Sequence, residues 1–131
     1  MIGLDTNVLV RHLVQDDPAQ SARASAFIEE SLTRQAPGFI NRIVLVDLIW
    51  VLETSYSYAR ELVAGTVERL LQTAELVVED ADDVAEALRR PRIVNADLVD
   101  LLLGVGNARR GCTTTYTFDR RVTRADGFTA L

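Results

Sequence analysis

The chain has 131 residues, 48% of them hydrophobic and 25% charged, with a formal net charge of −5 at pH 7, which predicts one globular domain spanning residues 1–131. A single cysteine and a single histidine exclude a disulfide framework, multi-cysteine zinc modules and two-histidine zinc sites, and favour a reducing compartment. All 14 basic residues are Arg, so P-loop, Schiff-base, receiver-domain and dehalogenase-like chemistries, which use a Lys, are excluded as well.

Short apolar runs alternate with stretches of helical spacing along the whole chain. In chain order we expect strands at residues 2–4, 39–40, 76–78, 113–115 and 128–130. The intervening helices are predicted at residues 6–14, 18 to about 32, 43–53, 59–73, 81–89 and 95–107. This alternation predicts an α/β fold with a largely parallel sheet.

Two of the predicted helices are almost entirely apolar. The helix at 43–53 is interrupted only by Asp47 and is expected to be buried on all sides. The helix at 95–107 is interrupted by Asp97 and Asp100. No apolar run is long enough to cross a bilayer and no secretory signal precedes the first strand, so a cytoplasmic location without membrane contact is expected.

Five acidic residues lie against apolar sequence, where acids are unusual. Asp5 directly follows the first predicted strand, and Asp119 closes the run Thr-Tyr-Thr-Phe-Asp just after the fourth. The other three, Asp47, Asp97 and Asp100, fall within the apolar helices. A buried carboxylate without a partner costs several kcal/mol, so each must cap a helix, pair with Arg or bind metal.

Ordinary structural roles are open to most of these acids. Asp5 and Asp119 are placed to act as helix N-caps or in Asx turns, and Asp97 can support the first turn of its helix. Thr6 can likewise cap the first helix. Asp47 and Asp100 are predicted inside helices, where only a buried Arg partner would serve.

A metal site is the alternative that accounts for the acids together. Asp97 and Asp100 share a helix face, while Asp5 and Asp119 lie beyond the carboxyl ends of strands, where ligands bind in parallel sheets. Oxygen ligands suit Mg²⁺ or Mn²⁺, and such a site suits phosphodiester hydrolysis. Thr6, Asn7 and Thr117 are candidates to orient a water or the substrate.

Charge is distributed unevenly along the sequence. Residues 1–88 carry a net charge of −9 and residues 89–131 a net charge of +4. Guanidinium groups bind phosphate in a bidentate manner, so the eight C-terminal Arg could line a nucleic-acid backbone, although each alone could equally be a solvated helix end. These residues are Arg89, Arg90, Arg92, Arg109, Arg110, Arg120, Arg121 and Arg124.

Four segments in order, covering essentially the whole chain, resemble PIN-domain ribonucleases of the VapC toxin family. They are Met-Ile-Gly-Leu-Asp-Thr-Asn-Val-Leu-Val-Arg at the start, residues 44–52, residues 96–100 and residues 112–119. An Asp-Thr-Asn after a strand is common, but the four segments in this order are specific.

The resemblance implies a three-layer α/β/α sandwich around a mostly parallel sheet of about five strands. It also implies Mg²⁺- or Mn²⁺-dependent endonucleolytic cleavage of RNA, a homodimer, and a cognate antitoxin that blocks the site. Asp5, Asp100 and Asp119 match the family's acidic ligands, and Asp97 matches an additional acid one turn earlier. Thr117 matches the small hydroxyl residue before the last acid.

Three functions are compatible with the sequence. The first is a metal-dependent endoribonuclease acting as the toxin of a toxin–antitoxin pair, with Asp5, Asp47, Asp100 and Asp119 as catalytic residues and Asp5, Asp97, Asp100 and Asp119 as metal ligands. The second is a PIN-like domain that binds RNA or a protein partner with weakened or lost catalysis. The third is an α/β interaction domain whose acids are caps and Arg partners.

Asp47 departs from the resemblance, because the family usually has Glu at this position. Asp is shorter by one carbon–carbon bond, about 1.5 Å, so its carboxylate reaches less far. We therefore expect Asp47→Glu to keep or raise metal-dependent RNA cleavage, measured as the initial rate beside the wild type. A clear loss of cleavage would show that Asp47 does not stand in for that Glu.

Overall fold

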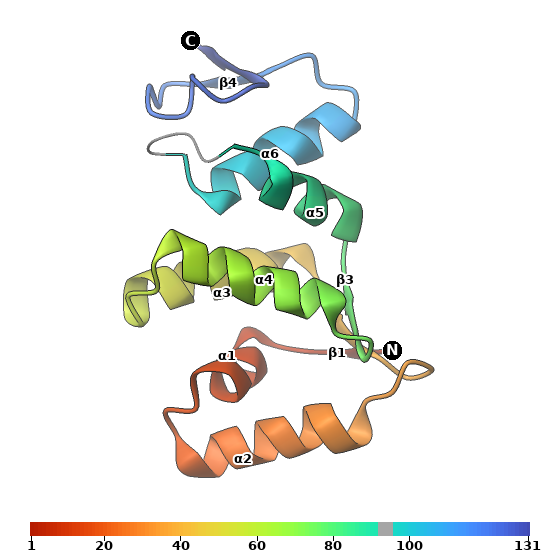
Figure 1. The fold of residues 1–131 in the computed structure, drawn as a ribbon. Coiled ribbons are helices and arrows are strands. Elements are labelled where there is room, and N and C mark those ends of the chain that lie inside the picture. The colour runs from red at the N-terminus through yellow and green to blue at the C-terminus, as the bar shows by residue number, and fades with distance from the viewer. Residues whose placement is uncertain (92–95) are drawn as a thin grey trace. The chain divides into compact units, whose positions relative to one another are not determined.

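The computed structural model describes residues 1–91 and 96–131, which form two compact units, Met1–Glu79 and Asp80–Leu131 (Figure 1). Arg92 and Asn95, the predicted first residue of the last helix, lie outside the described residues.

The first unit contains a three-stranded parallel sheet in the order β1-β2-β3. Its strands are β1 (Ile2–Gly3), β2 (Gly38–Ile40) and β3 (Leu76–Val78), close to the predicted positions. Ile2 pairs with Gly38, which in turn pairs with Leu76. The parallel pairing confirms the α/β class.

Four α-helices connect these strands along the chain: α1 (Thr6–Val14) and α2 (Pro18–Ala26) between β1 and β2, and α3 (Arg42–Ser55) and α4 (Arg60–Gln72) between β2 and β3. A π-helical turn, η1 (Phe27–Ser31), extends α2 almost to its predicted end. Asp17 caps α2 by accepting from the Gln20 amide at 3.0 Å, and Asn41 caps α3 through the Val44 amide at 2.8 Å. Fully buried aliphatic residues from α1, β2, α3 and α4 form the core, chiefly Leu9, Ile40, Leu45, Leu48, Ile49, Leu52, Val63 and Val67.

Helix α3 differs from its prediction. Its buried stripe is Val44, Leu45, Leu48, Ile49 and Leu52. On the other side of the helix, Ile43, Asp47 and Trp50 are all exposed. The exposed fraction is 79% for Ile43 and 62% for Trp50. The expectation of a helix buried on all sides was wrong, because an apolar composition does not show which face the sheet covers.

A polar network connects α1 with the end of α3. Arg11 donates to Asp16 at 2.9 Å and to the Tyr56 hydroxyl at 3.3 Å, and that hydroxyl donates to Asp16 at 2.7 Å. The Tyr56 hydroxyl and Arg11 lower the pKa of Asp16. Sequence spacing gave no sign of this contact, because Tyr56 is 40 residues from Asp16.

The second unit contains α5 (Ala81–Arg89), α6 (Leu98–Arg109), β4 (Thr115–Thr117) and β5 (Phe128–Ala130). Strands β4 and β5 form a parallel pair, with Thr115 opposite Phe128. The described residues therefore form a three-stranded and a two-stranded parallel sheet, whereas about five strands were expected in one.

Helix α6 positions both strands of the second unit. Gly104 lies against the Phe128 ring of β5, and a Cβ added at this position would come within 2.8 Å of that ring. Further along α6, the Asn107 side chain donates to the Thr115 hydroxyl of β4 at 2.9 Å. The helix thus contacts each strand through a different residue.

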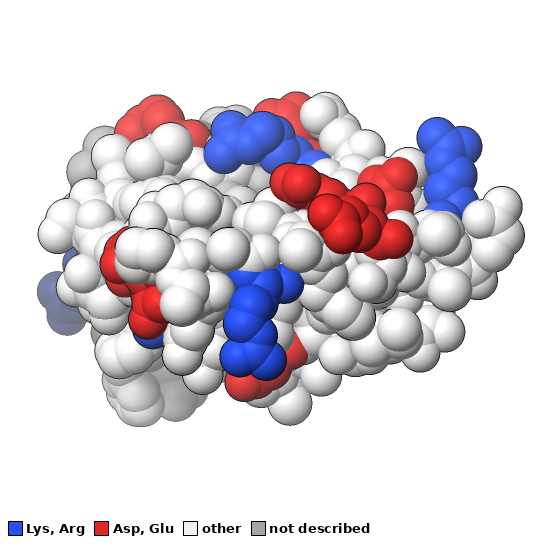
Figure 2. Space-filling view, turned by 90° about the horizontal axis from the view of Figure 1, so that it is seen from below, with Lys and Arg blue, Asp and Glu red and all other residues white. Residues whose placement is uncertain are grey.

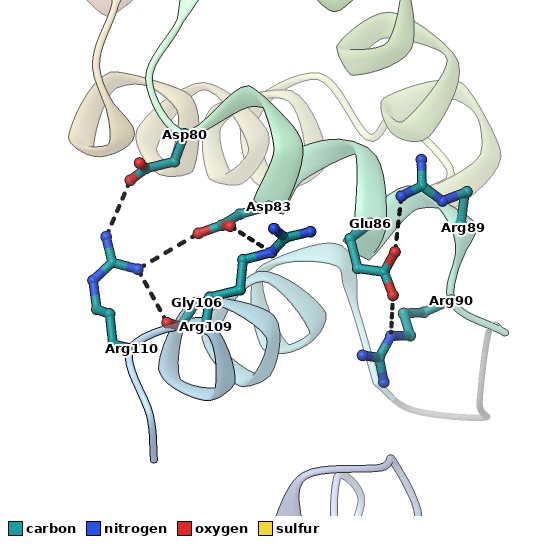
Figure 3. Close-up of polar contacts among 8 residues, drawn as sticks. All are labelled: Asp80, Asp83, Glu86, Arg89, Arg90, Gly106, Arg109 and Arg110. Carbon is teal, nitrogen blue, oxygen red and sulfur yellow. Dashed lines mark hydrogen bonds and ion pairs between the residues drawn. The ribbon is translucent and has the colours of Figure 1, made fainter.

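Helices α5 and α6 are joined by a charged cluster around Asp83, whose carboxylate is buried (Figure 3). Arg109 binds one Asp83 oxygen at 2.8 Å and Arg110 the other at 3.5 Å. Arg110 also donates to Asp80 at 3.2 Å and to the Gly106 carbonyl at 3.0 Å. Asp80 occupies the N-cap position of α5 without making a side-chain capping bond.

Among residues 1–91 and 96–131, no helix is long and apolar enough to cross a membrane. Figure 2 shows one face of the molecule, on which acidic and basic side chains are interspersed among uncharged ones. That face carries no continuous basic band.

We expect Asp83→Ala to lower the free energy of unfolding by about 1–2 kcal/mol, because two Arg lose their shared acceptor while remaining partly hydrated. Urea denaturation measures the change. Asp82→Ala is the matched control, since Asp82 lies beside Asp83 on α5 but is exposed. Equal stability of the two variants would contradict a role for the Asp83 cluster.

Candidate metal centre

Asp5 follows β1 and occupies the N-cap position of α1, but its carboxylate makes no side-chain capping bond. The chain is extended at this residue, so the carboxylate is exposed where the strand becomes the helix. The capping role considered for Asp5 is therefore not realised. The exposed carboxylate is accessible to a ligand.

Thr6 and Asn7 follow Asp5 in the first turn of α1. Thr6 is the first helical residue and is buried, so the expectation that it caps the helix was wrong. Asn7 is exposed and lines a cleft of about 650 Å³ with residues of α1, α2 and η1. Of the two, Asn7 is the more accessible to a substrate.

Asp47 lies on the exposed side of α3, between Ile43 and Trp50. A buried Arg partner was the structural alternative for this residue. Exposure removes the need for such a partner, since a hydrated carboxylate carries little desolvation cost.

Asp97 and Asp100 form a reciprocal capping box at the start of α6. The Asp97 carboxylate accepts from the Asp100 amide at 2.9 Å, and the Asp100 carboxylate accepts from the Asp97 amide at 3.1 Å. The capping role expected for Asp97 is confirmed. The placement of Asp100 in a helix interior was wrong, because α6 begins at Leu98 and not at residue 95.

Asp119 follows β4 by two residues and is fixed by hydrogen bonds on both sides. The Thr117 hydroxyl accepts from the Asp119 amide at 2.9 Å. The Asp119 carboxylate accepts from the Arg121 amide at 2.9 Å, the Asx turn that the sequence allowed. Arg121 also binds this carboxylate through its guanidinium and, together with its amide, lowers the pKa of Asp119 to about 2.

Two other candidate acids of the second unit act on Asp100. Burial raises the pKa of the Asp100 carboxyl, and the negative charges of Asp97 and Asp119 raise it further. Asp97 contacts Asp100 directly through the capping box and Asp119 belongs to the same unit, while Asp5 and Asp47 belong to the first unit.

The chemistry of these donors fits a divalent cation. Carboxylate oxygens are the ligands that Mg²⁺ and Mn²⁺ prefer, and a cation would offset both the burial of the Asp100 carboxylate and its repulsion from Asp97 and Asp119, which together raise its pKa. The capping box uses one oxygen of each of its two carboxylates. Among the described residues, no three His, Cys, Asp or Glu side chains are already arranged to hold a metal.

Five of the eight C-terminal Arg residues bind carboxylates, Arg121 through Asp119 as described above. Arg89 and Arg90 bind Glu86, while Arg109 and Arg110 bind Asp83. Arg120 and Arg124 are exposed and make no salt bridge to a described residue. Because so many guanidinium groups are paired, the sequence overstated the basic charge available to a phosphate backbone.

Sequence reasoning missed the specific role of Arg121, which it grouped with the other C-terminal Arg. The available signal was its position two residues after a strand-ending Asp, the spacing at which an Asx turn brings the two side chains together.

We expect Asp100→Asn to leave the melting temperature unchanged or raised at neutral pH, because the raised pKa means that ionised Asp100 disfavours the folded state. The destabilisation by ionised Asp100 is absent at low pH and appears as pH rises through the folded pKa. The difference in melting temperature between Asp100→Asn and the wild type should therefore narrow as the pH is lowered toward 3.8. Thermal unfolding across this range is the measurement.

Asp97→Ala is the comparison variant, since it removes the N-cap acceptor and should cost about 1 kcal/mol. A clear destabilisation by Asp100→Asn at neutral pH would contradict the crowding of these carboxylates.

Comparison with known proteins identifies the family of the chain. The family model of the PIN domain matches residues 2–128. No curated protein matches the chain. With nearly its whole length matched, the chain belongs to the PIN domain family.

Proposed function

We propose that this PIN domain is a metal-dependent endoribonuclease that acts as the toxin of a toxin–antitoxin pair. PIN domains are typically nucleases and generally use divalent metal ions. The observation that carries the proposal is the capping box that joins the Asp97 and Asp100 carboxylates at the start of α6, where burial, and then the charges of Asp97 and Asp119, raise the pKa of Asp100. Crowded carboxylates are costly for an apo fold and useful for a metal site.

The proposed site residues are the acids that the sequence indicated. Asp5, Asp97, Asp100 and Asp119 are the proposed metal ligands, and Asp5, Asp47, Asp100 and Asp119 the proposed catalytic residues. A bound divalent cation would lower the pKa of a water and stabilise charge on the phosphodiester. Support comes from the Asp5 carboxylate, which caps nothing, and from the exposure of Asp47.

Neighbouring polar residues would orient the reacting groups. Thr117 fixes the backbone of Asp119, so that this carboxylate stays in place after β4. Asn7, which is exposed beside Asp5, is proposed to hydrogen-bond the substrate or a water. Thr6 is buried and is proposed to support the same turn.

The wider proposal follows the VapC resemblance. We propose one PIN-like domain over residues 1–131 with a single, mostly parallel sheet of about five strands. RNA is the proposed substrate, with a cognate antitoxin and a second copy of the chain as protein partners, in the cytoplasm. The parallel pairing of β1-β2-β3 and of β4-β5 supports the proposed sheet.

Metal binding gives the first test, because it does not depend on finding the correct RNA. We expect Mn²⁺ titration by calorimetry to show stoichiometric binding to the wild type and loss of binding in an Asp5→Ala, Asp100→Ala double variant. Absence of binding in the wild type would reject the metal site.

Cleavage gives the second test. We expect Asp100→Asn to abolish Mn²⁺-dependent RNA cleavage while the protein remains folded, since a neutral amide is a much poorer ligand than a carboxylate. An unchanged rate would reject the catalytic role of Asp100. RNA binding by the wild type without turnover under any metal would favour the binding domain with lost catalysis.

A further inference from the structure

Arg121 holds the carboxylate of Asp119 in a side-on, bidentate ion pair. Its Nε donates to Asp119 Oδ1 at 3.0 Å and its Nη2 donates to Oδ2 at 2.8 Å. The Arg121 amide adds a third bond, to Oδ1, at 2.9 Å. Both oxygens of a proposed metal ligand are therefore engaged by one neighbouring residue.

The guanidinium of Arg121 also lies in the field of the other two acids. Asp100 and Asp97 both attract it and contribute to its raised pKa, after the larger contribution of Asp119. Among the described residues, Arg121 forms its salt bridge with Asp119. Arg121 thus holds one of these carboxylates directly and is attracted by the charges of the other two.

We propose that Arg121 is a built-in counter-cation of the acidic site, which holds Asp119 until a divalent cation binds and displaces the guanidinium from that carboxylate. This inference rests on the metal site proposed above. It adds a competition between a side chain and the metal for the same oxygens.

Displacement is the expected response of Arg121, because a guanidinium stays protonated at any accessible pH and cannot relieve its repulsion from a metal by losing a proton. The side chain is 68% exposed, so it can swing into water. Asp119 would stay in place when it leaves, since the Thr117 hydroxyl holds the Asp119 amide independently.

Calorimetric titration with Mn²⁺ tests this competition. We expect Arg121→Ala to bind Mn²⁺ roughly three- to tenfold more tightly than the wild type, the range expected for removing an exposed bidentate pair. Arg124→Ala is the matched control, because it removes the same charge from the same segment without touching Asp119. It should bind Mn²⁺ close to the wild-type affinity.

The outcomes separate this inference from the proposed function. Equal affinity in wild type and Arg121→Ala, weaker binding in Arg121→Ala, or an equal gain in Arg124→Ala would overturn the counter-cation role and leave the metal site standing. No Mn²⁺ binding in any of the three proteins would overturn the metal site and the inference with it. Binding seen only in Arg121→Ala would support both.

A second measurement follows the side chain directly. In the wild type, the Nε–H resonance of Arg121, assigned by its loss in Arg121→Ala, should shift toward that of a solvated Arg when Mg²⁺ is added. The Arg124 resonance should not move. An Arg121 resonance that stays unchanged at saturating Mg²⁺ would overturn the displacement.

Discussion

Helix α6 is fixed at its first turn by the reciprocal bonds between Asp97 and Asp100, and the second unit is built on this helix. In the middle of the helix Gly104 lies against the Phe128 ring, and in its last turn Arg109 binds Asp83 of α5. A helix end leaves amide groups without partners, so the first turn needs acceptors of its own. The same two carboxylates that satisfy this need are candidate metal ligands. The residues that stabilise the first turn of the helix are therefore also residues of the proposed metal site.

The positions of most elements could be predicted from periodicity, because a buried helix face and a buried strand each impose a regular spacing. The helix at Thr6–Val14 and the strand at Leu76–Val78 were predicted without error. The start of α6 was misplaced, since an apolar run does not show where the capping acid lies. The exposed face of α3 was missed for a related reason, as nothing in its composition distinguishes Trp50 from Leu48.

The candidate acids could be found from sequence because a charge within apolar sequence needs an explanation. Their partners could not. The pairing of Asp83 with Arg109 and of Asp16 with Tyr56 joins residues far apart in the chain, and no local spacing encodes such contacts. Whether an acid is a cap, an ion-pair partner or a ligand depends on these neighbours. Sequence alone therefore limits the possible roles of an acid but does not decide among them.

The capping box has a consequence for judging related chains. Asp97 and Asp100 serve the helix whether or not a metal binds, so folding alone would preserve them in a relative that no longer cuts RNA. The carboxylate of Asp5, in contrast, makes no capping bond to α1. In a set of PIN domains with this capping box, the acid after the first strand is therefore the more informative marker of retained nuclease activity, and acids at the start of α6 are a weak one.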